Sequence, residues 1–231
     1  MKIGNFDSGM GGTAIMSVIK NLLPKEEYFY IADSKNCPYG EKTDEELAKI
    51  VEHNVETLKN WGAKIIVIAC NTATVKCIEN LREKYPEIKF VGTEPAIRLA
   101  ASTDAKNILV LATPGTVKSE HVQKLLQENQ KTGQTITLLP CPGLADTIEH
   151  TLRFTDDYKP LPIDKSEKDV INQKLQELFQ DITETPDTVV LGCTHYSLIK
   201  PEIQAFFENA KIIDGNIGVA HRTAEVVDSM I

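Results

Sequence analysis

The stretch IIVIACNTAT, residues 65–74, sets the fold expected for this chain. Four β-branched residues in a row form a short, continuous apolar run, which is typical of a strand buried on both faces of a sheet. A small residue, Cys70 and polar side chains follow directly, and residues 72–84 then read as a helix. Because open α/β sheets bind ligands at the carboxyl ends of their strands, Cys70 is predicted to lie where chemistry takes place.

A second stretch, TVVLGCTHY, residues 188–196, repeats this construction much later in the chain. Its apolar run again ends in a small residue and a cysteine, Cys193, which Thr194 and His195 follow. The sequence therefore carries two strand-end cysteines in matching settings.

Apolar runs of strand length alternate with helical patterns along the whole chain. The predicted strands cover residues 2–6, 28–32, 65–68, 89–91, 108–112, 135–139, 188–191 and 211–213. Strands that alternate with helices indicate a mostly parallel sheet. The two halves look alike in outline, so we expect an α/β protein of two similar lobes. Each lobe would be a mostly parallel sheet flanked by helices, with the active site between the lobes.

The expected boundary between the lobes lies near Pro95. Residues 1–94 would form the first lobe and residues 95–207 the second, with a C-terminal helix within 208–231 returning to the first. Thr43 and Glu46 have the spacing of a capping box and open a predicted helix. One helix is expected to continue from the turn at residues 113–116 to about residue 130, and residues 154–165 read as a surface loop.

The composition is that of an ordinary soluble globular protein, with 42% hydrophobic and 25% charged residues among 231. The net charge of −8 and the lack of a basic stripe argue against a nucleic-acid partner. No apolar stretch approaches the roughly 18–20 residues that span a bilayer, and no signal-peptide core opens the chain. We therefore expect a cytoplasmic protein that does not enter a membrane.

The five cysteines are an odd number and form no C-x-x-C pair. This pattern argues against a disulfide framework and against a structural metal site, so reduced thiols and no bound metal are expected. Cys77 and Cys141 read as small core residues. Cys37 is expected to line a site without reacting.

A rival interpretation starts from the glycine-rich turn after the first strand. Gly9, Gly11 and Ala14 fit the spacing of the dinucleotide-binding fingerprint, and Asp33 ends the second strand where a ribose-binding acid would lie. Asp7 stands between the strand and the glycines, however, and its carboxylate would repel a pyrophosphate from the helix N-terminus. A nucleotide site is therefore the weaker interpretation.

The strand-end cysteines allow two kinds of chemistry. Each is expected just before a helix N-terminus, where the helix dipole lowers a thiol pKa from about 8.5. One activated cysteine with His195 as base would suggest covalent catalysis. Two equivalent cysteines on facing lobes suggest racemisation, in which Cys70 and Cys193 exchange protons with opposite faces of one carbon. No lysine suited to pyridoxal phosphate stands at a strand end, which favours chemistry without a cofactor.

Six motifs in order, spread over almost the whole chain, resemble the glutamate racemases of the cofactor-independent aspartate/glutamate racemase superfamily. They are FDSGMGG at 6–12, PYG at 38–40, CNTA at 70–73, EPA at 94–96, ATPGT at 112–116 and LGCTHY at 191–196. One departure is Ser197, where the family usually has proline, which changes the start of the following helix.

The resemblance implies interconversion of L- and D-glutamate without a cofactor, supplying D-glutamate for peptidoglycan in a bacterial cytoplasm. By the family pattern, Cys70 would abstract the α-proton of the D-enantiomer with help from Asp7, and Cys193 that of the L-enantiomer with help from His195. Glu149 would orient the histidine. The residues matching family positions that hold the substrate are Ser8, Pro38, Tyr39, Gly40, Asn71, Thr72 and Thr194. A homodimer is a further expectation from the family.

Three alternatives stay open on the sequence. An aspartate racemase of the same superfamily would differ in the depth of its pocket. A single-cysteine hydrolase or acyl transferase would need only one essential thiol. A nucleotide-binding protein without catalytic activity would use the glycine-rich turn.

Overall fold

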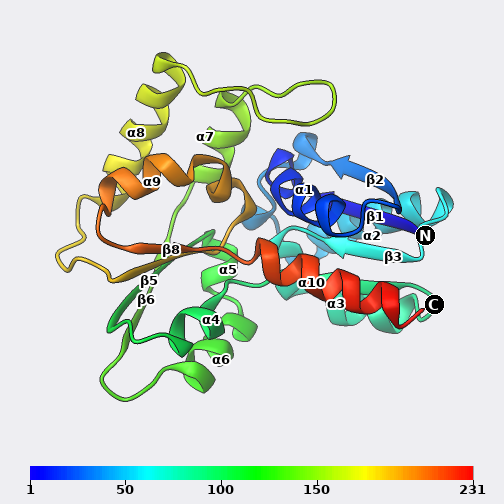
Figure 1. Ribbon diagram of the computed structural model, residues 1–231, viewed down its shortest axis with the longest axis horizontal. Helices are drawn as coiled ribbons and strands as arrows, with labels where there is room; N and C mark the ends of the chain where they lie inside the picture. The colour runs from blue at the N-terminus through cyan, green and yellow to red at the C-terminus, as the bar shows by residue number, and fades with distance from the viewer. Residues whose placement is uncertain (231) are drawn as a thin grey trace. The chain divides into compact units, whose positions relative to one another are not determined.

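The computed structural model describes residues 1–230 and divides into two compact units (Figure 1). Unit 1 comprises Met1–Glu94 together with the C-terminal segment that begins at Gly215. Unit 2 is Pro95–Asp214. Each unit has its own sheet, its own helices and its own hydrophobic core.

Unit 1 is built on a four-stranded parallel sheet in the order β2-β1-β3-β4. The strands are β1 (Lys2–Asp7), β2 (Glu27–Ala32), β3 (Ile65–Ile68) and β4 (Lys89–Gly92). Phe6 of β1 pairs with Ile31 on one side and with Ile68 on the other. The carboxyl ends of these three strands are therefore in register, and the residues that follow them meet at one edge of the sheet.

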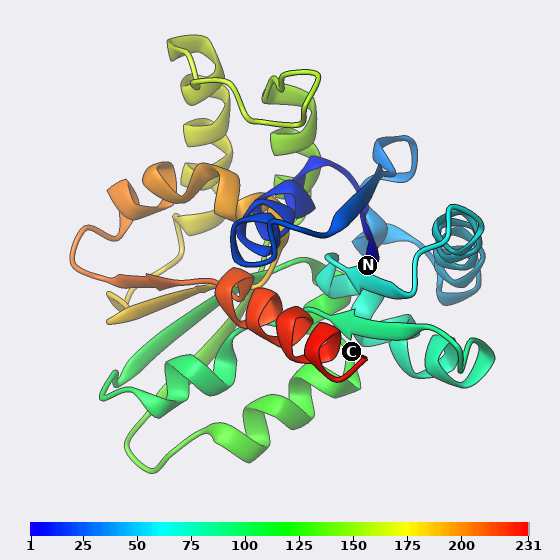
Figure 2. The same cartoon turned by 45° about the vertical axis from the view of Figure 1, so that its right-hand side comes forward.

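Helices cover both faces of this sheet. They are α1 (Thr13–Leu22), α2 (Asp44–Asn60), α3 (Asn71–Lys84) and α10 (Asn216–Asp228), with short 3₁₀ helices η1 (Met10–Gly12), η2 (Ser34–Asn36) and η3 (Tyr39–Glu41). The apolar core under α1 and α10 lies on one face, and the core under α2 and α3 on the other. The C-terminal α10 lies against α1 in both views (Figures 1 and 2).

Helix α2 illustrates why these elements form where they do. The Thr43 hydroxyl accepts from the Glu46 backbone N–H, while the Glu46 carboxylate accepts from the Thr43 backbone N–H, so the predicted capping box is confirmed. Leu47, Val51 and Val55 then recur at helical spacing and are fully buried. Gly62 follows the helix with φ of 93°, a conformation that side chains other than glycine's rarely adopt.

Unit 2 repeats the arrangement with a parallel sheet in the order β6-β5-β7-β8. Its strands are β5 (Asn107–Ala112), β6 (Thr135–Pro140), β7 (Thr188–Leu191) and β8 (Lys211–Ile213). Its helices are α4 (Ile97–Ser102), α5 (Pro114–Val117), α6 (Glu120–Asn129), α7 (Leu144–Thr151), α8 (Lys165–Phe179), η4 (Thr194–Ile199) and α9 (Lys200–Phe206). The hydrophobic core of unit 2 packs α7, α8 and α9 against alternate residues of β5 and β7.

The predicted fold class is confirmed: each unit is a parallel sheet flanked by helices. Three local predictions were wrong. The single helix expected to about residue 130 is interrupted, because the Ser119 hydroxyl caps a new helix by accepting from the Val122 backbone N–H. The surface loop ends one residue early, at Asp164, which caps α8. A 3₁₀ helix, not an α-helix, follows Cys193 directly.

Candidate active site

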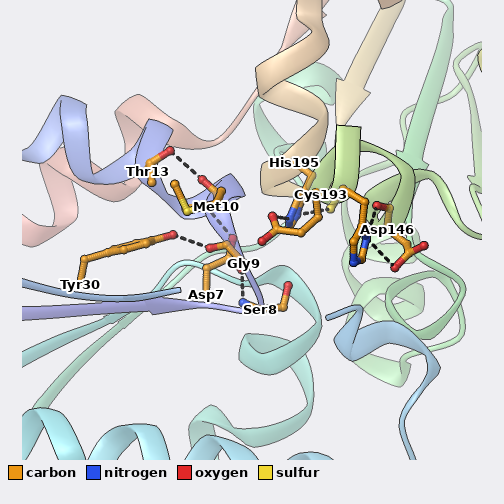
Figure 3. A network of polar contacts seen from close by, with 12 residues as sticks. Asp7, Ser8, Gly9, Met10, Thr13, Tyr30, Asp146, Cys193 and His195 are labelled. Carbon is orange, nitrogen blue, oxygen red and sulfur yellow. Dashed lines mark hydrogen bonds and ion pairs between the residues drawn. The ribbon is translucent and has the colours of Figure 1, made fainter. Parts of the chain in front are cut away.

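In unit 1 the candidate site begins at the carboxyl end of β1, with the buried carboxylate of Asp7. Its Oδ1 accepts from the Ser8 backbone N–H at 2.8 Å and its Oδ2 from the Gly12 backbone N–H at 2.6 Å (Figure 3). Backbone donors of this kind stabilise an ionised carboxylate. The same turn is held from β2, because the Tyr30 hydroxyl donates to the Gly9 carbonyl at 2.7 Å.

The glycine-rich turn folds around this carboxylate, and its backbone N–H groups donate to Asp7. A Cβ at Gly12 would lie 2.8 Å from the Cβ atoms of both Asp7 and Ala69, so only glycine fits there. A phosphate needs free backbone donors and no negative charge beside them. Here the Gly12 N–H already donates to Asp7, whose carboxylate lies where the phosphate would have to bind. The dinucleotide interpretation of the turn is therefore not supported by the geometry.

Cys70 lies at the same edge of the sheet. The Ala69 backbone N–H donates to the Phe6 carbonyl at 2.9 Å, which holds the chain after β3 next to the end of β1. Cys70 is buried and is the N-cap residue of the 14-residue helix α3. Its thiol is therefore next to the positive end of a helix dipole, which favours the thiolate.

Four candidate substrate-binding residues of unit 1 are buried around this edge: Ser8, Tyr39, Asn71 and Thr72. Pro38 and Gly40 are partly exposed. The Asn71 side-chain oxygen is buried and accepts no hydrogen bond from the protein. An unpaired buried acceptor costs about 1–3 kcal/mol, so Asn71 is suited to receive a donor from a ligand.

Tyr39 shares the electrostatic environment of Cys70 and Asp7. Burial raises the pKa of the Tyr39 phenol far above its ordinary value, and the hydrogen bond to Asp33 and the negative charges of Asp33, Cys70 and Asp7 raise that pKa further. Tyr39 therefore remains a neutral phenol, and these side chains form one cluster at the edge of the sheet.

In unit 2 the candidate site is a line of three side chains. The Cys193 Sγ lies 3.8 Å from Nδ1 of His195, and Nε2 of His195 lies 3.0 Å from Oε2 of Glu149 on α7 (Figure 3). All three side chains are buried. An ionised Glu149 can only accept, so it holds a proton on Nε2 and leaves Nδ1 to accept from the thiol. Thr194, between the cysteine and the histidine, is also buried.

The other cysteines lie in different environments. Burial raises the pKa of the Cys77 thiol to about 11 and that of the Cys141 thiol to about 12. Both remain protonated near neutral pH. Cys37 is partly exposed and follows the 3₁₀ helix η2. Among residues 1–230, no three His, Cys, Asp or Glu side chains gather as they would around a metal ion.

The structure brings together, within unit 1, Asp7, Ser8, Tyr39, Cys70, Asn71 and Thr72, and within unit 2, Glu149, Cys193, Thr194 and His195. Sequence reasoning missed Asn54, a buried amide on α2 that donates to the Tyr39 hydroxyl. A polar residue at an inward-facing position of an otherwise apolar helical stripe was the available signal. Asp33, the ribose-binding acid of the weaker nucleotide interpretation, accepts from Tyr39 instead.

Comparison with known proteins agrees with this geometry. The model of the Asp/Glu/Hydantoin racemase family matches residues 10–222. Curated glutamate racemases of Clostridium novyi (strain NT) and Pseudomonas putida are each 38% identical over 223 residues, which is 95% of this chain and 81% and 79% of those proteins. Among the described residues, no helix is long and apolar enough to cross a membrane.

A solved structure is similar over nearly the whole chain. The crystal structure of Escherichia coli glutamate racemase, in complex with L-glutamate and the activator UDP-MurNAc-ala, matches with a TM-score of 0.84 and 32% identity, covering 98% of this chain and 82% of that one. The family match, the curated relatives and this shared fold agree. The chain therefore belongs to the Asp/Glu/hydantoin racemase family of isomerases.

Proposed function

We propose that the protein interconverts L- and D-glutamate by a two-base transfer of the α-proton, with no cofactor, and so supplies D-glutamate for peptidoglycan. The observation that carries this proposal is the matched pair of buried cysteines, each two residues after the end of the equivalent strand, β3 in unit 1 and β7 in unit 2. The glutamate racemases among the relatives, and the L-glutamate named in the Escherichia coli complex, support the choice of substrate.

The proton balance assigns one step to each thiol. The Cys70 thiolate takes the α-proton of D-glutamate, and the Cys193 thiol gives its proton to the opposite face of the resulting carbanion. The product is L-glutamate, and the enzyme is left with a Cys70 thiol and a Cys193 thiolate, ready for the reverse reaction. Two such groups avoid the need for one base to move from one face of the carbon to the other.

Different neighbours assist the two thiols. Asp7 would accept a hydrogen bond from the Cys70 thiol, and the N-terminus of α3 would stabilise the thiolate. Nδ1 of His195 would accept a hydrogen bond from the Cys193 thiol, and Glu149 would hold the imidazole in the tautomer that allows it. Both arrangements lie in buried surroundings, where charge–charge interactions are stronger than in water.

The substrate-binding set suits an acidic amino acid. The unpaired Asn71 oxygen is an acceptor for the α-ammonium group. Hydroxyls of Ser8, Thr72 and Thr194 and the main-chain N–H groups of Tyr39 and Gly40 are donors for two carboxylates. Donors around the α-carboxylate also stabilise the charge that develops on it when the carbanion forms.

The test follows L-glutamate in D2O with purified protein freed of pyridoxal phosphate. The expected result is decay of the optical rotation to zero, with deuterium at Cα of the D-glutamate product before it enters the remaining L-glutamate. That order arises because the second thiol, exchanged with solvent, delivers deuterium to the new face. The same assay with L-aspartate tests the shorter substrate. No exchange with glutamate, from folded protein with reduced thiols, would overturn the proposal.

Two further expectations stay predictions: the cytoplasmic location expected from the sequence, and the homodimer expected from the family.

A further inference from the structure

The Tyr39 side chain is 0% exposed, and both of its hydroxyl interactions are made within unit 1. The hydroxyl donates its proton to Oδ2 of Asp33 at 2.7 Å and accepts from Nδ2 of Asn54 at 2.9 Å. A phenol has one proton to donate. The Tyr39 hydroxyl is therefore already committed before any substrate arrives.

The two partners of Tyr39 are themselves held in place. Nδ2 of Asn36 donates to both oxygens of Asp33, at 2.8 and 3.0 Å, and Asn54 also reaches Oδ2 of Asp33 at 3.4 Å. The Asp33 backbone N–H donates to the Asp7 carbonyl at 3.0 Å, which ties this carboxylate to the end of β1. Asn54 is 4% exposed and extends from the middle of α2.

These contacts join three separate pieces of unit 1 through one phenol. Asp33 follows β2, Tyr39 begins η3, and Asn54 belongs to α2. Pro38 and Gly40, on either side of Tyr39, are partly exposed, whereas the phenol between them points into the core. The buried phenol of Tyr39 therefore holds the middle of the 38–40 segment in place.

We propose that Asn54 and Asp33 are positioning residues that act through Tyr39, and that the Tyr39 side chain is the buried anchor of the 38–40 segment and does not bind the substrate. On the proposed function, which this inference deepens, the segment contacts the glutamate through its main chain and through Pro38 and Gly40. Asn54 and Asp33 then set where that main chain lies relative to Cys70.

Charge supports the same assignment. The phenol lies among the negative charges of Asp33, Cys70 and Asp7, and its pKa is raised far above the ordinary value, first by burial and then by these neighbours. Tyr39 does not ionise in the working pH range, so it does not serve as an acid or base for the α-carbon. A phenol that stays protonated is a permanent donor to Asp33.

The test uses Tyr39→Phe and Asn54→Leu, with Tyr28→Phe as the matched control. The Tyr28 hydroxyl likewise donates within unit 1, to the Leu23 carbonyl at 2.7 Å, but does so away from residues 38–40. Tyr39→Phe removes both hydrogen bonds of the hydroxyl, and Asn54→Leu removes the bond from Asn54. Each change should raise KM for glutamate roughly threefold to tenfold with kcat nearly unchanged. The double variant should cost no more than the larger single change, because the two residues act through one contact.

Amide hydrogen exchange of the free protein gives a readout that needs no turnover. Residues 34–42 should exchange faster in Tyr39→Phe and in Asn54→Leu, and at the wild-type rate in Tyr28→Phe. If the wild type fails to racemise glutamate, the proposed function fails while exchange still decides whether Tyr39 is an anchor.

A direct role for the phenol predicts the opposite pattern. Tyr39→Phe would then lower kcat or raise KM with unchanged exchange at residues 34–42, and Asn54→Leu would leave the kinetics alone. Either of those results would overturn the inference. If Asn54→Leu does not fold, Tyr39→Phe alone decides, since it removes a single oxygen atom.

Discussion

The two units have the same sheet topology but differ in the polar residues around it. β3 and β7 begin at Ile65 and Thr188, at the same spacing from Cys70 and Cys193, and these residues pair with Ile3 and Ile108 of the neighbouring strands. By this register, Asn5 is equivalent to Val110, and Asp7 is equivalent to Ala112. The central strand of unit 1 thus has two polar positions where the central strand of unit 2 is apolar.

On the proposed function, the difference corresponds to two ways of assisting a strand-end thiol. In unit 1 the acid stands on the adjacent strand and a 14-residue α-helix follows the cysteine. In unit 2 Ala112 offers no acid, a six-residue 3₁₀ helix follows the cysteine, and the carboxylate comes from α7 through His195. The proposed substrate is chiral and presents different groups to the two bases, which agrees with different neighbours for the two thiols.

The strongest test of equivalence replaces each strand-end thiol. Cys70→Ala and Cys193→Ala should each lower kcat/KM by about 10²–10⁴, the usual contribution of a general acid or base. Cys77→Ala and Cys141→Ala, one buried control in each unit, should keep near-normal activity because their thiols stay protonated. Racemisation rates measured from both enantiomers check this. Loss of activity in only one of the first two variants would favour a single-cysteine mechanism.

The next test compares the two acids. Asp7→Asn should lower kcat/KM roughly 10²-fold, because an amide removes the charge and cannot accept from both the Ser8 and the Gly12 N–H. Glu149→Gln should cost roughly tenfold, since its oxygen can still accept from His195.

Enantiomers have equal free energies, so each of these two variants must lose kcat/KM by the same factor in both directions. Initial rates from L- and D-glutamate, with thermal unfolding as a check on folding, measure both effects. A larger loss for Glu149→Gln than for Asp7→Asn would reverse the ranking of the two arrangements.

The next test exchanges the buried residues at equivalent central positions, Asn5 and Val110, and measures the free energy of unfolding. Asn5 is 1% exposed and both polar atoms of its side chain lack hydrogen-bond partners, whereas Val110 packs at the equivalent place. Val110→Asn should destabilise the protein by roughly 2–3 kcal/mol, and Asn5→Val should stabilise it by about 1 kcal/mol. Urea unfolding measures both changes. Destabilisation by Asn5→Val would instead indicate that the amide binds a buried water.

The smallest effect compares two equivalent helix caps. α2 and α8 each precede the cysteine-bearing strand of their unit, and each opens with a capping box, at Thr43 and at Asp164. Thr43→Ala should cost about 1 kcal/mol. Asp164→Ala should cost at least as much, because Asp164 also accepts from Arg153. Thermal unfolding of the two variants provides the comparison, and a cost at Thr43 well above that at Asp164 would contradict it.

Much of this arrangement could be predicted from residue pattern. The β-branched run ending in Cys70, the matching run ending in Cys193 and the capping box at Thr43 are local signals, and the structure has all three elements. The break before α6 was missed because Ser119 in a polar helical stretch resembles any other surface residue until its hydroxyl meets the Val122 N–H.

Periodicity and neighbours along the chain are enough to predict the succession of strands and helices and the positions of the two thiols. The partners of the polar side chains depend on the folded structure. Asn54 meets Tyr39 across a separation of 15 residues, which no local pattern encodes. Glu149 meets His195 across 46 residues, a pairing that the family resemblance implied and no local pattern shows. The role of a polar side chain depends on what buries it and what it can bond there, and packing alone determines both.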